Sequence, residues 1–193
     1  GIDKVDEDGK PLSGAVLQLL DAAGTEIDQW TTDGTTHRMD AILTAGAEYT
    51  LHEVSAPDGY CIAADQKFTV NADGSLTSVK LTNLSTKVQI SKTTITGDTE
   101  LEGAKLEVRD LSGNALDSWT SGKEAHMITA KLTAGQTYVL HETAAPNGYV
   151  VSNDIEFTVN ADGTVTKVIM KDDTTKVEIS KKAENGLPLS GAK

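Results

Sequence analysis

The chain has 193 residues, of which 38% are hydrophobic and 24% are charged, as is ordinary for a globular protein. Its 29 acidic residues outnumber its 17 basic residues, and the formal net charge of −12 argues against nucleic acid or an anionic membrane surface as a partner. No apolar run approaches the length that spans a membrane, so we expect no membrane insertion by these residues.

Short stretches of alternating apolar and polar residues, typical of β-strands, run along the chain and are separated by turns. In the first half they include residues 16–20, 47–51 and 67–70. Pairs such as Asp33-Gly34 and Asp73-Gly74 supply the glycine that tight hairpins need. No segment is predicted as a helix. The pattern predicts an all-β chain of Ig-like β-sandwich domains, each with about seven strands.

One sequence signature occurs twice. The pattern Tyr-x-Leu-His-Glu-x-x-Ala-Pro-x-Gly-Tyr, called the box below, lies at residues 49–60 and again at residues 138–149, an offset of 89 residues. The same offset relates Trp30 to Trp119, which lie outside the box. The whole unit is therefore duplicated, and the chain is a repeat array.

The offset predicts three segments: unit 1 at residues 1–84, unit 2 at residues 85–175, and the truncated start of a third repeat at residues 176–193. The sequence Thr-Lys-Val-Glu-Ile-Ser-Lys at residues 175–181 repeats Thr-Lys-Val-Gln-Ile-Ser-Lys at residues 86–92. We therefore expect the chain to come from a longer array. The third segment has neither a box nor a last strand, so we expect it to form no crosslink within the chain and to be mobile or held by neighbouring contacts.

The link between the two units, residues 84–87, contains neither glycine nor proline. Such a short link predicts a stiff end-to-end pair of domains.

Three separated motifs occur in the same order in both units: a lysine near the start, the box, and an Asn or Asp on the last predicted strand. Together they resemble the Cna-B type, SpaA-like (prealbumin-like) domains of Gram-positive surface proteins and pilins. The resemblance covers nearly the whole chain. It implies tandem prealbumin-like β-sandwiches in which a first-strand lysine joins a last-strand Asn or Asp through a spontaneous isopeptide bond, assisted by the box glutamate.

Carried over to unit 1, the resemblance implies a bond between Lys4 and Asn83, assisted by Glu53. In unit 2 it implies a bond between Lys92 and Asp172, assisted by Glu142.

The 89-residue offset from Asn83 selects Asp172 rather than its neighbour Asp173. Neighbours on a strand point to opposite faces, so only one of the two can reach the core unless the strand is bulged.

The chemistry needs these residue types for physical reasons. An amine is nucleophilic only when neutral, and burial lowers the pKa of a lysine toward that form. Burial also raises the pKa of a carboxyl group, so that a buried glutamate can stay protonated and shuttle protons. Packing then turns the amidation into an intramolecular step, with an effective molarity of order 10⁵ M in favourable cases. For unit 2 an unreacted buried salt bridge is the alternative.

Several other residues are expected to be structural. Cys61 is the only cysteine, so no intramolecular disulfide can form, and Val150 occupies the equivalent position in unit 2. His52 and His141 are expected to face away from the core, and neither a metal site nor a cofactor is predicted. The sequence Leu-Pro-Leu-Ser-Gly at residues 187–191 looks like a sortase signal but matches the start of unit 1, so we interpret it as a repeat start.

The favoured function is a structural stalk repeat of a Gram-positive cell-surface adhesin or pilus-like protein, located outside the cell at the wall or surface. Its partners would be neighbouring repeats, with a host ligand reached through other domains, and the chain is expected to be a monomer. The alternative is that the repeats themselves bind a host protein or glycan. Enzymatic turnover is not expected, because no triad or phosphate loop occurs and the proposed chemistry consumes its own residues.

Overall fold

The computed structural model describes residues 1–191 as thirteen β-strands that fall into two units. The last two residues of the expected third segment, at positions 192–193, lie outside the described residues. The strands of unit 1 are β1 (Ile2–Asp6), β2 (Ser13–Asp21), β3 (Glu26–Asp33), β4 (Glu48–Ser55), β5 (Gln66–Thr69) and β6 (Val79–Asn83). The strands of unit 2 are β7 (Lys87–Thr94), β8 (Lys105–Arg109), β9 (Ala115–Thr120), β10 (His126–Thr129), β11 (Thr137–Ala144), β12 (Ile155–Thr158) and β13 (Val165–Asp172). Within this part of the chain no helix is long and apolar enough to cross a membrane.

Each unit is a sandwich of two sheets. In unit 1 a four-stranded sheet, ordered β3-β2-β4-β5, faces the pair β1-β6, and in unit 2 the sheet β12-β11-β8-β9 faces the sheet β10-β7-β13. Apolar residues of both layers form one buried cluster per unit, as the strand alternation requires. The predicted all-β tandem sandwich is therefore confirmed.

The two units differ at the edge of the smaller sheet. Strand β10 pairs with the first four residues of β7, from Lys87 to Ile90. In unit 1 the strand that corresponds to β7 starts only at Ile2, and the corresponding edge segment is reduced to a single bridge between Ile2 and His37. Unit 1 consequently has six strands and unit 2 has seven.

The first and last strands of each unit pair in parallel. Strand β1 runs beside β6, with Lys4 opposite Leu81, and β7 runs beside β13, with Lys92 opposite Met170. Side chains two positions apart share a face, so Asn83 and Asp172 point to the same side as the two lysines. Because β13 keeps its register with β7 from Val165 to Asp172, no bulge disturbs this arrangement.

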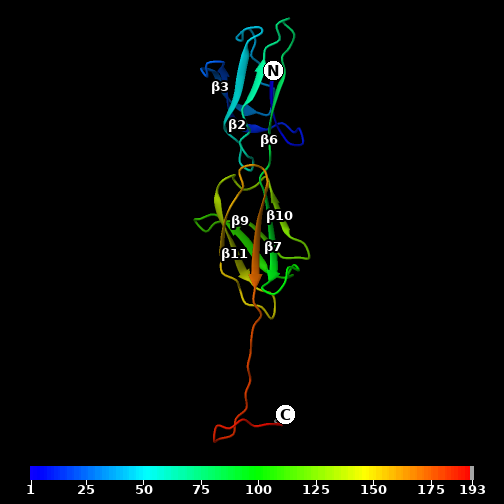
Figure 1. Cartoon of the computed structure of the whole chain (residues 1–193), viewed down its shortest axis with the longest axis vertical. Helices are drawn as coiled ribbons and strands as arrows, with labels where there is room; N and C mark the ends of the chain where they lie inside the picture. Colours follow the sequence, from blue (N-terminus) through cyan, green and yellow to red (C-terminus); the bar gives the residue numbers. More distant parts are fainter. Residues whose placement is uncertain (192–193) are drawn as a thin grey trace.

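The two units lie end to end, with unit 1 above unit 2 along the long axis of the molecule (Figure 1). Thr86 bonds to both: its N–H donates to Gly59 O at 2.9 Å, and its hydroxyl donates to Leu132 O at 2.7 Å. The N–H of Ala130 donates back to Thr86 O at 3.0 Å. These bonds tie the short link to a turn of each unit.

The turn that carries Glu7 supports the same link from the side of unit 1. Its carboxylate accepts hydrogen bonds from the N–H of Ser85 at 3.0 Å and from the Ser85 hydroxyl at 2.5 Å, and it lies 3.3 Å from Lys87 Nζ. Burial alone would raise the pKa of Glu7, but the bonds from Ser85 and Lys87 outweigh it and lower the pKa to about 2.

After residue 175 the chain leaves unit 2 and extends along the long axis (Figure 1). Val177 and Ile179, which correspond to the buried Val88 and Ile90 of unit 2, are both largely exposed there. The segment forms one isolated bridge of its own, between Lys182 and Pro188.

Candidate functional site

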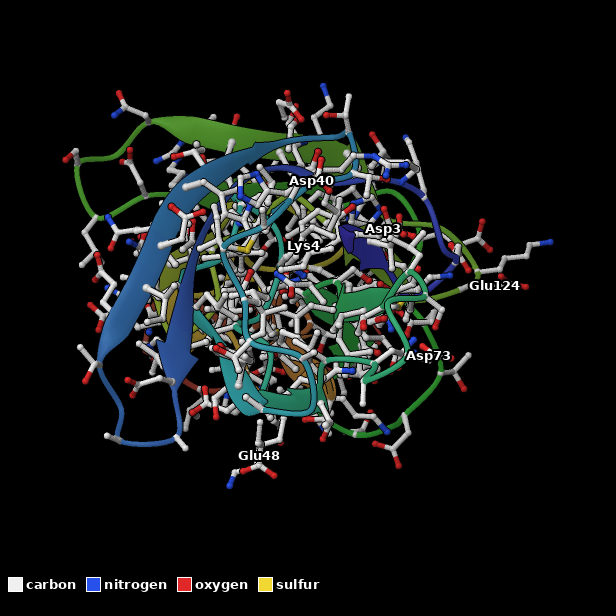
Figure 2. All side chains as sticks on the ribbon, turned by 90° about the horizontal axis from the view of Figure 1, so that it is seen from above. Asp3, Lys4, Asp40, Glu48, Asp73 and Glu124 are labelled. Carbon is white, nitrogen blue, oxygen red and sulfur yellow. The ribbon has the colours of Figure 1, made fainter. Side chains whose placement is uncertain are left out.

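Three strands bring Lys4, Glu53 and Asn83 together in the core of unit 1. Lys4 comes from β1, Asn83 from the neighbouring β6, and Glu53 from β4 in the facing sheet. All three side chains are buried, and Asn83 is completely inaccessible. In the view along the long axis, Lys4 lies over the interior whereas Glu48 and Glu124 project from the rim (Figure 2). A polar cluster in this position is costly unless its members satisfy one another.

The polar atoms of this cluster are arranged as an amine, an acyl group and an acid. Lys4 Nζ donates to Asn83 Oδ1, and it also lies 3.3 Å from Leu81 O and 3.7 Å from Glu53 Oε1. Asn83 Nδ2 donates to Glu53 Oε1 at 2.9 Å. The other oxygen of Glu53 accepts a hydrogen bond from the N–H of Ala63 at 2.6 Å. The carboxyl group is thus held against the nitrogen of the Asn83 amide.

Burial also changes the protonation of the amine. Desolvation lowers the pKa of Lys4 from 10.5 to about 8, although the nearby Glu53 works in the opposite direction. A substantial fraction of Lys4 is therefore neutral, and hence nucleophilic, at mildly alkaline pH.

The corresponding cluster of unit 2 contains Lys92, Glu142 and Asp172. Lys92 Nζ donates to Asp172 Oδ1 and lies 3.1 Å from Glu142 Oε1. Asp172 is fully buried at the end of β13, whereas Asp173 is partly exposed and pairs with Lys176 at 2.8 Å. Of the two neighbouring aspartates, only Asp172 faces the lysine.

Ser152 belongs to this second cluster, and sequence reasoning missed it. Its N–H donates to Glu142 Oε2 at 2.7 Å, as the N–H of Ala63 does to Glu53 in unit 1. Unlike Ala63, it also brings a hydroxyl, 2.7 Å from Asp172 Oδ1. The residue lies outside the box, and only an alignment of the two units at the 89-residue offset could have drawn attention to it.

Among residues 1–191, two buried oxygens of unit 2 accept no hydrogen bond, Glu142 Oε1 and Asp172 Oδ2, although Glu142 Oε1 lies 3.1 Å from Lys92 Nζ. In unit 1 the corresponding atoms, Glu53 Oε1 and Asn83 Nδ2, bond to each other. Glu142 Oε1 is thus paired with the Lys92 amine, and Asp172 Oδ2 is the oxygen of this cluster that no donor contacts.

The other residues singled out in the sequence lie away from these clusters. His52 and His141 face outward and pair with Asp65 and Asp154 at 2.7 and 2.6 Å. Cys61 is buried at the junction of the units, and burial raises the pKa of its thiol. Among residues 1–191, no three His, Cys, Asp or Glu side chains cluster as a metal site would require.

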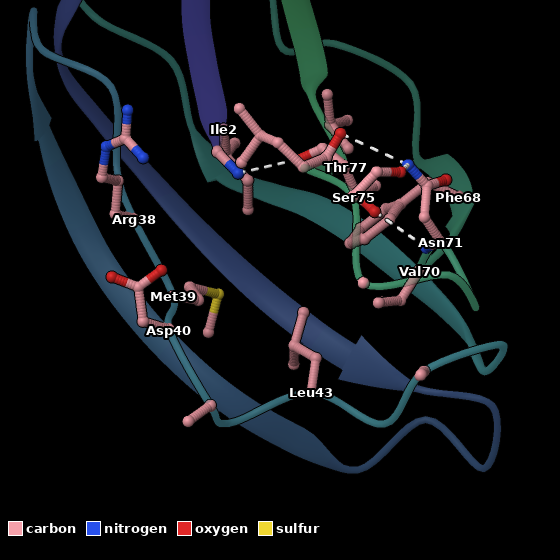
Figure 3. A pocket seen from close by; sticks show the side chains of 16 residues that line it. Ile2, Arg38, Met39, Asp40, Leu43, Phe68, Val70, Asn71, Ser75 and Thr77 are labelled. Atoms are coloured by element: carbon pink, nitrogen blue, oxygen red, sulfur yellow. Dashed lines mark hydrogen bonds between the residues drawn. The ribbon is translucent and has the colours of Figure 1, made fainter.

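A cavity of about 320 Å³ lies at the end of unit 1 that faces away from unit 2 (Figure 3). Its lining includes Ala41, Leu43 and Gly74. At the 89-residue offset these correspond to Ala130, Leu132 and Gly163, which in unit 2 lie at the junction with unit 1. The cavity therefore occupies the end of unit 1 that corresponds to the docking end of unit 2.

The family model of SpaA, described as a prealbumin-like fold domain, matches residues 1–85 and again residues 86–174. The chain belongs to this family. The two matches cover nearly all of it and place the boundary between the SpaA domains one residue after the expected division at residues 84 and 85. No curated protein matches the chain significantly.

Solved structures with similar folds include pilus proteins. The C-terminal fragment of the pilus adhesin SpaC from Lactobacillus rhamnosus GG has a TM-score of 0.50 and 16% identity, covering 92% of this chain and 97% of its own. The shaft pilin SpaA of the same organism has a TM-score of 0.41 and 17% identity, covering 92% and 98%. The Bacillus anthracis TIE protein is 26% identical with a TM-score of 0.48, and the match covers 90% of this chain but 33% of the TIE chain. At these identities the likeness to the pilus proteins concerns the fold alone.

Proposed function

We propose that the two SpaA units are structural stalk repeats of a Gram-positive cell-surface adhesin or pilus-like protein. Each unit would be closed by a spontaneous isopeptide bond, Lys4 to Asn83 in unit 1 and Lys92 to Asp172 in unit 2. Glu53 and Glu142 would assist, each in its own core. The protein would then act outside the cell, where a covalent staple protects a small domain from force and proteolysis.

The observation that carries this proposal is the burial of a lysine, an acyl side chain and a glutamate together, twice, between the first, middle and last strands. Structural ion pairs rarely take this form, because burial of charge costs more than the pairing returns. If the lysine and the acyl side chain react to form a neutral amide, the cost of burying their charges disappears.

In unit 1 the neutral Nζ of Lys4 attacks Cγ of Asn83, and the C=O electron pair moves to Oδ1. Glu53 takes one proton from the attacking nitrogen and delivers one to Nδ2, to which its Oε1 is already hydrogen-bonded at 2.9 Å. The C–Nδ2 bond then breaks, ammonia leaves and the carbonyl reforms. One amide bond is made and one is broken, and Glu53 ends as it began.

The strand order supports a load-bearing role. Because β1 and β6 are neighbours in parallel, as are β7 and β13, force entering one end of a unit reaches the crosslinked pair without passing through the strands between. Closing a loop of about eighty residues also removes unfolded-state entropy, worth roughly 4 kcal/mol on the model used for disulfides.

The alternative, in which the repeats bind a host protein or glycan directly, has less support. Three residues that line the cavity at the end of unit 1, Ala41, Leu43 and Gly74, are counterparts of residues that lie at the unit-to-unit junction in unit 2. Its position suits the docking of a neighbouring repeat better than a ligand site peculiar to this chain. Neighbouring repeats are thus the favoured partners, and a host ligand would be reached through other domains.

Mass spectrometry tests the proposal. The intact chain should be lighter than its sequence by one ammonia plus one water, and protease digestion should release two branched peptides, one joining Lys4 to Asn83 and one joining Lys92 to Asp172. A native mass measurement should find a monomer. An unmodified mass with linear peptides only would refute the covalent part of the proposal.

A further inference from the structure

The two clusters are not chemically identical, and the difference is confined to two positions. Where unit 1 has Asn83 and Ala63, unit 2 has Asp172 and Ser152. The remaining members, a lysine and a glutamate, are shared. The backbone N–H of Ala63 or Ser152 holds the glutamate in the same way in both units, at 2.6 and 2.7 Å. The hydroxyl of Ser152 therefore occurs together with the change from Asn83 to Asp172, while the way in which the glutamate is held stays the same.

The hydroxyl distinguishes the two oxygens of Asp172. Oδ1 accepts a hydrogen bond from the Ser152 hydroxyl at 2.7 Å and another from the amine of Lys92. Oδ2 accepts none from the residues that the structure describes. By the correspondence with unit 1, Oδ1 matches the carbonyl oxygen of Asn83, which is retained, and Oδ2 matches the departing nitrogen. Ser152 thus contacts the oxygen that keeps its bond to carbon.

We propose that Ser152 is a catalytic residue of unit 2, whose hydroxyl stabilises the oxyanion that forms on Asp172 Oδ1 when Lys92 attacks. The inference rests on the proposed isopeptide function and adds a residue that unit 1 does not have. A donor aimed at the oxygen where charge develops is the general device by which acyl transfer is accelerated.

Lys92 Nζ, as the neutral amine, forms a bond to Cγ of Asp172, whose Oδ2 carries the proton, and the C=O electron pair moves to Oδ1. Glu142 takes one proton from the attacking nitrogen and delivers it to Oδ2. The C–Oδ2 bond breaks, water leaves and the carbonyl reforms at Oδ1. Glu142 and Ser152 are both regenerated.

A hydroxyl has one proton, and Ser152 has two acceptors in reach, because Lys171 O lies 2.5 Å from Oγ. Before reaction the carbonyl of Lys171 competes for the proton. As Oδ1 gains negative charge it becomes the stronger acceptor, since hydrogen bonds to ionised oxygens are roughly twice as strong as neutral ones. The bond to Oδ1 consequently strengthens in the transition state, which is the requirement for catalysis.

The acyl partner explains why only unit 2 needs the hydroxyl. In Asn83 the nitrogen and the oxygen differ chemically, and the N–H bond to Glu53 orients the amide. A carboxyl group has two similar oxygens, and a proton on Oδ1 instead of Oδ2 would put the leaving group beside the amine. By donating to Oδ1, Ser152 leaves Oδ2, the counterpart of the departing Asn83 Nδ2, as the oxygen that carries the proton.

The test follows bond formation in unreacted chain, which is assembled from synthetic peptides by ligation in denaturant, so that it has never folded, and is then refolded by dilution. Samples are quenched in acid and digested, and the two branched peptides are quantified separately. Ser152→Ala should slow closure of unit 2 by about a hundredfold, the lower end of the effect of removing one oxyanion donor. Closure of unit 1 in the same molecules should keep its rate, which reports that the chain still folds. The exposed Ser112→Ala is the matched control and should change neither rate.

A second variant separates chemistry from structure. Ser152→Ala combined with Asp172→Asn gives unit 2 the residue set of unit 1, so it should close faster than Ser152→Ala alone and release ammonia instead of water. If Ser152 served only to hold the carbonyl of Lys171, the double variant would be as slow as the single one, and the inference would fail. Closure of Ser152→Ala at the wild-type rate would overturn it as well. A wild-type chain with no branched peptide from unit 2 would instead refute the underlying isopeptide bond.

Discussion

Asn83 donates from Nδ2 to Oε1 of Glu53 at 2.9 Å, so the nitrogen that must depart in unit 1 already contacts the group that would protonate it. The hydrogen bonds and ion pairs of this cluster stay within unit 1, and those of Lys92 and Glu142 stay within unit 2. The two cores are therefore expected to react independently.

Glu53→Ala should abolish the bond of unit 1 and leave that of unit 2 intact, and Glu142→Ala should do the reverse. Each substitution removes the glutamate carboxyl group that lies beside the lysine amine of its own core. Peptide mapping of the purified variants gives the answer, with the exposed Glu48→Ala as control. Loss of both bonds from one substitution would mean that the units are coupled.

Lys4→Met should lower the free energy of unfolding of unit 1 by about 4 kcal/mol, because the closed loop is lost while an apolar stem of similar length remains. Chemical denaturation should then show unit 1 unfolding in an earlier, separate transition. Lys80→Met, on the exposed face of β6, is the matched control and should leave the transitions where they are. A variant with unchanged denaturation midpoints would show that the isopeptide bond contributes nothing to the stability of unit 1.

Closure of unit 1 should depend on pH through the amine. Burial lowers the pKa of Lys4 to about 8, so the amine is mostly protonated and unreactive below pH 8 and mostly neutral above it. Refolding of unreacted chain in a pH series around 8 should show a rate that rises with pH and levels off above the pKa. A rate that falls as pH increases across this range would contradict attack by the neutral amine.

Gly59→Ala should open the junction. A Cβ there would lie 2.4 Å from the carbonyl carbon and oxygen of Ala130 in the other unit, and the backbone φ is +83°. Gly148→Ala is a matched control, because its φ of +88° is similarly strained but a Cβ there would meet no atom within 4 Å. Through this backbone strain, each substitution should lower the free energy of unfolding of its own unit by about 1 kcal/mol or more. Only Gly59→Ala should separate the units.

Cys61 provides the measurement for that comparison. Cys61 is 3% exposed at the junction, whereas the corresponding Val150 at the other end of unit 2 is 51% exposed. Alkylation of Cys61 under native conditions should be faster in Gly59→Ala than in the wild type or in Gly148→Ala. Equal rates in all three proteins would mean that the junction does not shield the thiol.

The sequence predicted the fold well because strand alternation and glycine turns are local signals, and the prediction of two tandem sandwiches is confirmed. The choice of Asp172 over Asp173 followed from strand alternation and the repeat offset, and the structure places only Asp172 in the core. Ser152 could not be selected this way, because its importance depends on how the chain after the box folds back over Glu142. The sequence also did not predict that the counterpart of β10 in unit 1 would be reduced to a single bridge. Strand β10 pairs with Lys87–Ile90, and of these four residues only Ile90 has a counterpart in β1, Ile2.

The parallel neighbours β1 and β6 have a consequence for a stalk that has been nicked by a protease. With the amide in place, a single cut anywhere between Lys4 and Asn83 leaves both pieces in one covalent molecule, and the same holds between Lys92 and Asp172. The stretch between the two closed rings, residues 84–91, is where one cut parts the units. Thr86 in that stretch is 1% exposed and hydrogen-bonded to both units, so a protease reaches its backbone only after the junction has opened.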